Sequence, residues 1–371
     1  MPHLHKLIDR LTDLVGQHAN LRFRFLEVCG THTTSVVRHG LDTVFPDRLE
    51  LISGPGCPVC VMPVGYIDQS LRLAGIPGVI MTTFGDLMHV PGGGHRTLAD
   101  PSAAGRGERV RVVYSPLDAL KIAEENPRSE IVFLAVGFET TAPAVALALE
   151  KAEAAHIDNF SILPGHRLIP PVLRKMAQSG NLEVDGFLAP GHVSTIIGME
   201  PYAFLPQEYA MPVVIGGFAP EEIIGALLLL VTLVVNDHYQ VINAYPKAVS
   251  PLGNMKAQGL VAKYFEPGAA FWRGLGEIEK SGLKLKEQYL NRNAAVRFKI
   301  PFRDVPDPAG CSCGSVLAGR LKPTDCPLFG LACRPEHPVG PCMVSSEGSC
   351  AAYYRYGKGG SRVVPDFVIP W

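Results

Sequence analysis

Short apolar runs alternate with helical patterns between residues 21 and 240, and this alternation constrains the fold more than any other feature. Eight runs have the length and composition of β-strands: residues 21–28, 49–53, 78–84, 109–115, 130–136, 160–163, 185–189 and 212–217. Helical patterns stand between several of them, as at 143–155 and 220–235. Strands that alternate with helices favour parallel βαβ units. We therefore predict an α/β fold with two consecutive Rossmann-like domains, residues 21–125 and 126–240.

The two ends of the chain depart from this pattern. Apolar residues at helical spacing between Leu4 and Val15 predict an amphipathic helix within residues 1–20, which we expect to pack with a third domain. That domain, residues 241–371, contains a segment at 311–350 that is rich in Cys, Gly and Pro and has little periodicity. Such a composition is typical of a small segment held by a metal. We predict a small, loop-rich third domain.

The composition limits the classes of function. The chain has 371 residues with a formal net charge of −1, which argues against nucleic-acid binding. The longest apolar run, residues 223–235, is shorter than the roughly 20 residues that a membrane helix needs, so we predict a buried core helix. The amino terminus lacks the apolar core of a signal peptide. We expect a cytoplasmic protein with no nucleic-acid or membrane partner.

The nine cysteines are unevenly distributed, with three before residue 61 and six after residue 310. They are too dilute for a secreted disulfide scaffold. In a cytoplasmic protein such cysteines more often serve metal or redox chemistry.

Cys57 and Cys60 lie in "LISGPGCPVC", where Pro58 and the preceding Gly-Pro-Gly favour a held geometry. Such a pair can form a reducible disulfide or contribute half of a zinc site. The local sequence favours neither over the other, although no second Cys-x-x-Cys stands at the spacing of a zinc ribbon.

Cys29 lies in "EVCGTHT", at an expected helix start. A thiol at a helix amino terminus has a lowered pKa and is a better nucleophile or soft-metal ligand. His32 could deprotonate this thiol or bind metal. The pattern also occurs in ordinary loops.

Polar residues follow several of the predicted strands. They are Asp86, Glu139, Thr140, Thr141 and His192. Ligands bind at the carboxyl ends of strands in doubly wound sheets, so these residues predict a functional cleft. Capping of helices is the alternative, above all for the two threonines. Glu139 and His192 directly follow apolar strands, where burial without a partner is costly.

Six cysteines crowd the carboxyl-terminal segment: Cys311, Cys313, Cys326, Cys333, Cys342 and Cys350. Thiolates on a loop-rich segment suit either an iron–sulfur cluster or structural zinc. Their irregular spacing favours the iron–sulfur cluster.

The motifs together resemble one known family. They occur in the order "CGTHT", "GPGCPVC", "TFGD" with "VPG", "YSPLDAL", "GFETTAP", "PGHVS", "WRGLG" and "CMVSSEG" followed by "CAAYY". This set resembles the HypD-type maturation proteins of [NiFe]-hydrogenases, from about residue 25 to residue 356. Two details differ from the family pattern: His89 stands where an arginine is usual, and "EIEKSG" replaces a proline-containing version after "WRGLG".

The resemblance implies a function. Such a protein pairs with a small HypC-type chaperone, and together they hold an iron ion while two cyanides and one carbon monoxide are attached. A HypE-type partner delivers each cyanide as a thiocyanate. The resemblance also implies a [4Fe–4S] cluster in the carboxyl-terminal segment and a fold of two α/β domains plus a cluster-bearing third.

Within that role, we expect Cys29 to bind the iron, with His32 orienting the thiolate. The Cys57/Cys60 pair would hold two electrons as a dithiol, and the cluster would recharge it. This scheme requires the three amino-terminal sulfurs to meet in one pocket. For the cluster we predict Cys326, Cys333 and Cys350, with Cys311 preferred over Cys313 as the fourth ligand and Cys342 as a spare thiol.

Two other functions remain open on the residues alone. One is a stand-alone iron–sulfur thiol–disulfide oxidoreductase that uses Cys57/Cys60 and needs no partner. The other is a zinc-held binding module without redox chemistry.

Overall fold

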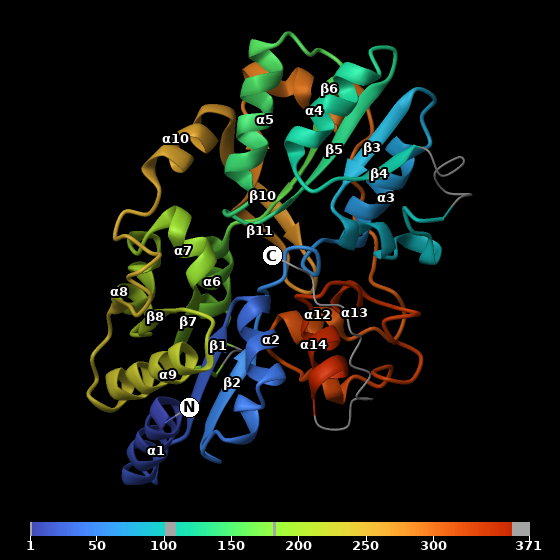
Figure 1. Ribbon diagram of the computed structural model, residues 1–371. Helices are drawn as coiled ribbons and strands as arrows, with labels where there is room; N and C mark the ends of the chain where they lie inside the picture. The colour runs from blue at the N-terminus through green and yellow to red at the C-terminus, as the bar shows by residue number, and fades with distance from the viewer. Residues whose placement is uncertain (1, 101–108, 181–182, 358–371) are drawn as a thin grey trace.

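The computed structural model describes residues 2–100, 109–180 and 183–357 (Figure 1). Residues 358–371, the end of the predicted third domain, and residues 101–108, within the predicted first domain, lie outside the described part. So do residues 181–182 of the predicted second domain.

The first sheet has five parallel strands in the order β2-β1-β7-β8-β9. They are β1 (Phe23–Glu27), β2 (Leu49–Ser53), β7 (Gly186–Pro190), β8 (Val213–Gly216) and β9 (Val241–Asn243). In the register of β1 and β2, Glu27 lies opposite Ser53, so both strands end at the same edge of the sheet. That edge carries the loops with Cys29 and Cys57.

The second sheet has four parallel strands in the order β4-β3-β5-β6. They are β3 (Val79–Thr83), β4 (Val110–Val112), β5 (Glu130–Gly137) and β6 (Phe160–His166). The central strands β3 and β5 are almost entirely buried, as expected for a parallel sheet covered on both faces.

The α/β class with two parallel sheets is therefore confirmed, but the predicted division into consecutive domains at residues 125 and 240 is wrong. Strands β1 and β2 pair with β7, which the prediction assigned to the second domain, while β3 and β4 pair with β5 and β6. Apolar runs predict where strands form, but the pairing of strands depends on packing between distant residues. The second sheet is thus inserted, in chain order, between two parts of the first.

Helices cover both sheets (Figure 1). They are α1 (Pro2–Gln17), α2 (Gly30–Arg38), α3 (Val64–Ala74), α4 (Pro116–Glu125), α5 (Ala142–Ala154), α6 (Ile169–Gln178), α7 (Gly191–Ile197), α8 (Phe204–Tyr209) and α9 (Pro220–Val235). Short 3₁₀ helices lie in the connections: η1 (Leu41–Thr43), η2 (Gly85–His89), η3 (Gly93–His95), η4 (Glu200–Tyr202), η5 (Glu287–Arg292) and η6 (Pro323–Asp325). No helix in the described ranges is long and apolar enough to span a bilayer.

The amino-terminal helix forms as predicted, but its packing differs from the prediction. Leu11 and Val15 of α1 are buried in one apolar cluster with Ile223, Leu227 and other residues of α9. We expected α1 to contact the third domain. Instead, its apolar face covers the side of α9 that does not pack on the first sheet. The burial of α9 itself is confirmed.

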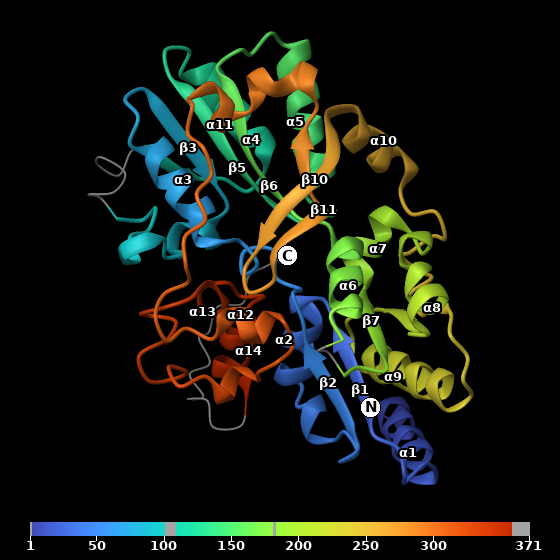
Figure 2. The same ribbon diagram turned by 180° about the vertical axis from the view of Figure 1, so that it is seen from behind.

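The third region begins with a hairpin that the sequence pattern did not predict. Helix α10 (Met255–Tyr264) leads into the antiparallel strands β10 (Phe265–Trp272) and β11 (Gly276–Leu285), followed by α11 (Ala294–Arg297). The hairpin lies along the second sheet and extends toward the carboxyl-terminal segment (Figure 2). At its tip Gly274 has φ +75°, and a Cβ there would lie 2.3 Å from the Cα of Gly314. Glycine allows this close approach.

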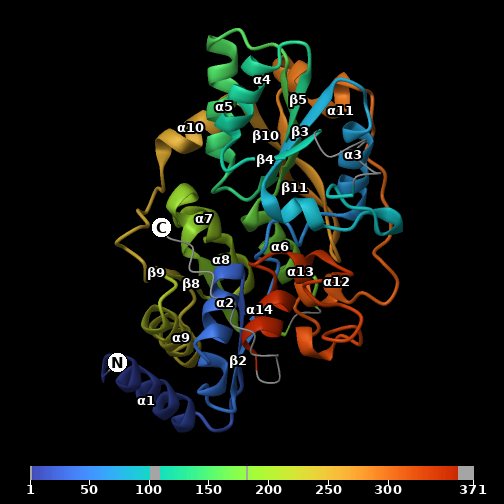
Figure 3. The same cartoon turned by 45° about the vertical axis from the view of Figure 1, so that its right-hand side comes forward.

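The carboxyl-terminal segment is loop-rich, as predicted, with three short helices: α12 (Cys313–Leu317), α13 (Pro341–Val344) and α14 (Ser349–Tyr356). Helix α14 packs beside α2 of the first sheet (Figure 3). This contact brings the most distant cysteine-bearing parts of the chain next to each other.

Candidate functional site

The loops that follow β1 and β2 touch directly. The amide of Gly30 donates to the carbonyl oxygen of Gly56 across 3.0 Å. A Cβ at Gly56 would lie 2.2 Å from the backbone nitrogen of Cys29, so only glycine lets the loops approach this closely. Cys29 therefore lies against the residue that precedes Cys57.

Cys57 and Cys60 form a disulfide with a Cα–Cα distance of 5.2 Å. The amide of Cys60 donates to the Cys57 sulfur at 3.1 Å, and both residues are buried, at 3% and 0% exposure. Pro58 and its neighbours hold the pair in a tight turn between β2 and α3. Of the two alternatives that the sequence left open for this pair, the structure contains the disulfide.

Glu27 at the end of β1 organises the loop around Cys29. One carboxylate oxygen accepts the amide of Cys29 at 2.8 Å, and the other accepts the hydroxyl of Thr33. Burial raises the pKa of Glu27 to about 7, although these two donors and Ser53 lower it. The first turn of α2 is thereby fixed to the edge of the sheet.

The prediction of a lowered pKa at Cys29 is wrong for this structure. Cys29 stands at the N-cap of α2, and the amides of Thr31 and His32 do lower its pKa. Burial, together with the negative charges of Glu27 and Glu347, outweighs them and raises the pKa to about 12. The thiol is protonated near neutral pH until a cation, such as a bound metal, compensates the charge.

His32 contacts Cys29 through its backbone rather than through its ring. The Nε2 atom of His32 lies 2.9 Å from the carbonyl oxygen of Gly217, and the ring packs against Phe218. Burial lowers the pKa of His32 to about 4, and no described residue forms a hydrogen bond with its Nδ1. A ring that accepts the Cys29 proton, one of the predicted roles, does not correspond to this geometry.

The carboxyl-terminal segment closes over these loops. A Cβ at Gly30 would lie 2.2 Å from the carbonyl oxygen of Glu347, and the Glu347 carboxylate accepts a hydrogen bond from Thr31. The hydroxyl of Ser345 donates to Asp86 at 2.7 Å. Asp86 lies in η2, directly after β3, so the segment joins the ends of strands from both sheets.

The same segment reaches the disulfide. The Cys60 sulfur lies 3.9 Å from the carbonyl oxygen of Pro341, the residue before Cys342. Cysteines from the two ends of the chain are therefore neighbours across this contact.

Glu139 follows β5 and faces the interior. One of its oxygens accepts the amide of Ile169 at 2.8 Å, and the other has no partner within residues 2–100, 109–180 and 183–357. Burial raises the pKa of Glu139 to about 7. Burial raises the pKa of Tyr202, and the negative charges of Glu139 and Cys29 raise it further.

The remaining predicted cleft residues have separate surroundings. Thr141 stands at the N-cap of α5 but donates to the carbonyl oxygen of Phe138 at 3.2 Å, and Thr140 is exposed. His192 stacks on Phe218 with a centroid distance of 3.9 Å, and the ring of His32 contacts the same phenylalanine. The two histidines thus share one phenylalanine at the edge of the first sheet.

All six carboxyl-terminal cysteines line one cavity, which we call the six-cysteine cavity. Its lining residues are Cys311, Cys313, Cys326, Leu328, Phe329, Cys333, Gly340, Cys342, Met343 and Cys350. The sulfurs of Cys313 and Cys342 lie 2.6 Å apart, and Cys311 and Cys350 continue this chain of contacts on either side. Cys342, predicted to be spare, lies in the wall with the others.

The donor set of the six-cysteine cavity fits an iron–sulfur cluster. Six of its lining residues are cysteines, and Leu328, Phe329 and Met343 add apolar cover. The space is small, about 10 Å³, so the loops that carry the thiols would move apart around a cluster. In the described ranges, no three Cys, His, Asp or Glu side chains already converge on a single-ion site.

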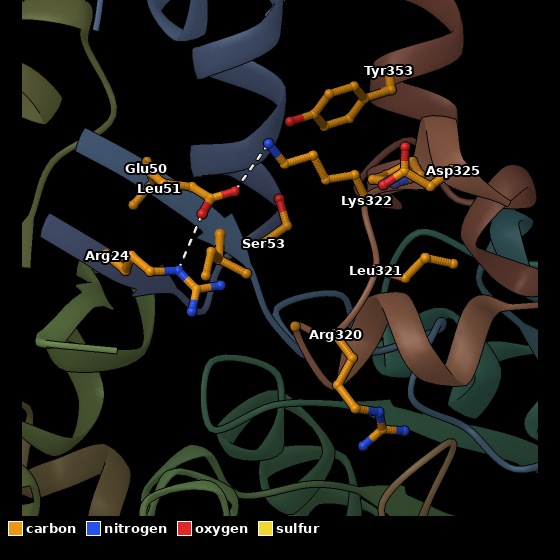
Figure 4. A pocket seen from close by; sticks show the side chains of 12 residues that line it. Arg24, Glu50, Leu51, Ser53, Arg320, Leu321, Lys322, Asp325 and Tyr353 are labelled. Atoms are coloured by element: carbon orange, nitrogen blue, oxygen red, sulfur yellow. Dashed lines mark hydrogen bonds and ion pairs between the residues drawn. The ribbon is translucent and has the colours of Figure 1, made fainter. Parts of the chain in front are cut away.

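A larger pocket, about 160 Å³ in volume, lies where the segment around residues 319–325 meets β1 and β2 (Figure 4). Glu50 bridges Arg24 at 3.1 Å and Lys322 at 2.9 Å across it. The ionic bridge fixes the carboxyl-terminal segment to the edge strand of the first sheet. None of the predicted site residues lines this pocket.

Sequence reasoning did not single out Glu27, Tyr202 or Glu347 as site residues. Glu27 and Glu347 stand inside quoted motifs next to cysteines, and that position was the available signal. Tyr202 joins the site through packing between distant parts of the chain, for which the sequence offers no local signal.

Comparison with known proteins identifies the family of the chain. The family model named HypD, described as "Hydrogenase formation hypA family", matches residues 3–357. The chain is 47% identical over 343 residues to hydrogenase maturation factor HypD2 of Bradyrhizobium diazoefficiens, covering 91% of this chain and 90% of the relative. It is 44% identical over 334 residues to hydrogenase maturation factor HypD of Escherichia coli, covering 90% and 89%.

A third relative, HypD of Cupriavidus necator, is 45% identical over 344 residues, or 91% of this chain and 90% of the relative. The family-model match, residues 3–357, spans both sheets, the loops with Cys29 and Cys57, and the six-cysteine segment. The resemblance inferred from the motifs is thereby confirmed. The chain belongs to the HypD family of hydrogenase maturation factors.

Proposed function

We propose that the protein is a cytoplasmic scaffold for assembly of the iron centre of a [NiFe]-hydrogenase. With a small HypC-type chaperone it would hold an iron ion while two cyanides and one carbon monoxide are attached, and a HypE-type partner would supply cyanide as a thiocyanate. One observation carries the proposal: the cysteine-bearing segment at 341–350 lies against both the Cys29 loop and Cys60.

Cys29 is the proposed iron ligand. A soft, strongly donating thiolate suits an iron ion that takes up cyanide and carbon monoxide. The positive charge of the iron would offset Glu27 and Glu347, whose charges hold the proton on the free thiol. The substrate iron and the two carboxylates therefore favour the same location.

Cys57 and Cys60 are the proposed source of two electrons. In the dithiol form they would donate two electrons and two protons to the partner's thiocyanate and become the disulfide. The S–CN bond would break as the disulfide forms, which yields the partner's thiol and hydrogen cyanide. The hydrogen cyanide would lose its proton to solvent as the cyanide anion binds the iron. Their position in the loop that touches Cys29 supports this role.

The six-cysteine cavity is the proposed site of a [4Fe–4S] cluster, with Cys311, Cys326, Cys333 and Cys350 as ligands. Bound there, the cluster would supply single electrons for re-reduction of the disulfide. All four of these thiols line the cavity, which supports this ligand set.

The test is infrared spectroscopy of the full chain purified with its small chaperone. We expect cyanide and carbon monoxide stretching bands in the unsubstituted complex, and none for cyanide in Cys57→Ser or Cys60→Ser, with the brown cluster absorbance retained. Val59→Ala keeps both sulfurs in the same turn and serves as the control. Cyanide bands of full intensity in Cys57→Ser would overturn the proposed electron source. A brown chain that reduces disulfides and never co-purifies with a chaperone would favour the stand-alone oxidoreductase.

A further inference from the structure

Arg273 is a buried cation at the tip of the β10–β11 hairpin. Its side chain is 0% exposed. The Nε atom donates to the carbonyl oxygen of Met62 at 3.0 Å, and the backbone amide donates to Val61 at 2.9 Å. Arg273 is therefore hydrogen-bonded to the two residues that directly follow Cys60.

The guanidinium group has one ionic partner and one unused donor. Its Nη1 pairs with Asp307, whose side chain is 32% exposed. Its Nη2 is buried and forms no hydrogen bond with any residue of the described ranges. A buried charge with an unused donor is costly, because the group has lost its hydration without full compensation. The position favours a further negatively charged partner.

The six-cysteine cavity lies beside this cation. Gly274 packs against Gly314, so the hairpin tip touches the residue after Cys313. The positive charge of Arg273 acts on Cys311 and Cys313, and the negative charge of Asp307 acts on Cys313. The cation thus stands between the disulfide turn and the thiols.

We propose that Arg273 stabilises negative charge on the iron–sulfur group of the six-cysteine cavity and so makes that group easier to reduce. Charge and hydrogen bonds near the sulfurs are what set the reduction potential of such a group. The negative charge of Asp307, the ion-pair partner of Arg273, would make the same group harder to reduce. This inference rests on the proposed location of the cluster.

The experiment is an anaerobic redox titration of the full chain with its cluster, followed by electron paramagnetic resonance, with iron counted in every sample. Arg273→Met keeps the apolar stem and removes the charge. We expect the equilibrium constant for reduction to fall about tenfold to a hundredfold, as for loss of a charged hydrogen bond. Asp307→Asn should shift the potential in the opposite direction, and Arg273→Lys should stay near the unsubstituted protein.

Arg292→Met is the matched control. Arg292 is also buried, at 7% exposure, but it donates to the carbonyl oxygens of Ile157 and Phe160 at the second sheet. We expect the reduction potential of the iron–sulfur group in Arg292→Met to equal that of the unsubstituted protein.

Opposite shifts in Arg273→Met and Asp307→Asn support the inference, whereas an unchanged potential in Arg273→Met with full iron content overturns it. If Arg273→Met loses iron, the test is the reduction potential of the iron–sulfur group in Asp307→Asn. A positive shift of that potential supports the inference, and an unchanged potential overturns it. An unsubstituted chain that binds no iron would overturn the cluster location as well, while failure of the Arg273 variants alone leaves that location intact.

Discussion

The amide of Gly30 and the carbonyl oxygen of Gly56 are joined by a hydrogen bond of 3.0 Å, which fixes the loop after β1 against the loop after β2. Each glycine stands next to a cysteine of the proposed iron site. The position of one thiol relative to the disulfide is therefore set by backbone contacts, and side chains at residues 30 and 56 would disturb it.

The first prediction concerns Gly56. In Gly56→Ala the new Cβ would lie 2.2 Å from the nitrogen of Cys29, and the contact is with backbone that cannot move aside cheaply. We expect a loss of about 1–3 kcal/mol in the free energy of unfolding, measured by urea denaturation. Gly225→Ala is the control: it has no described atom within 4 Å of its Cβ and lies in helix α9.

In the control we expect a gain of roughly 0.5–1 kcal/mol, because alanine stabilises a helix relative to glycine. Equal stability of Gly56→Ala and the unsubstituted protein would show that the two loops are not in the contact described.

The second prediction concerns Glu139 and pH. Burial raises its pKa from 4.5 to about 7 in the folded protein. Below pH 4.5 the carboxyl is protonated in both states. As pH rises toward 7 the unfolded chain ionises first, so the unfolded state is favoured and stability falls. Glu139→Gln removes this dependence.

We expect the variant to gain on the order of 3 kcal/mol relative to the unsubstituted protein between about pH 4.5 and pH 8. Unfolding free energies at both pH values measure the gain. Glu183→Gln, at a side chain that is 90% exposed, is the control. A difference that stays constant with pH would refute the burial of an ionisable Glu139.

The third prediction concerns the ligands of the proposed cluster. Cys326→Ser should lose most of the iron and sulfide per chain, because it removes one of the four proposed thiolates. Cys342→Ser should retain both, because Cys342 is not one of the four proposed ligands although it lines the same cavity. Iron and sulfide counts on anaerobically purified protein make the comparison. Unaltered iron in Cys326→Ser would show that the ligand set is wrong.

Much of the secondary structure could be predicted from the sequence. A strand forms within or from each of the eight apolar runs, and the run at 223–235 lies in a buried helix. These elements could be predicted because residues that are buried in a strand or helix are apolar at regular spacings along the chain. The order of strands could not be predicted. It depends on pairs such as Phe25 with Gly186, which are far apart in the sequence. The hairpin β10–β11 was missed for the same reason, since its faces pack partly against solvent and show no clean alternation.

The candidate site shows the same limit. The distribution of the cysteines singled out two regions of the chain, which the structure brings into contact. It did not indicate the environment of each thiol. The pKa of Cys29 was expected to fall from its place at a helix start, and it rises because Glu347 arrives from the other end of the chain. The ring of His32 was expected near Cys29, but it packs under Phe218, which belongs to the loop after β8.

The insertion of the second sheet into the first has a consequence for biosynthesis. During translation β1 and β2 leave the ribosome early, but their neighbour β7 follows only after all of β3 to β6. Until then β1 has one strand partner, and the loops with Cys29 and Cys57 lack most of their surroundings. Strand pairing over such separations is slow. The region that carries the thiols is therefore among the last to mature in the nascent chain.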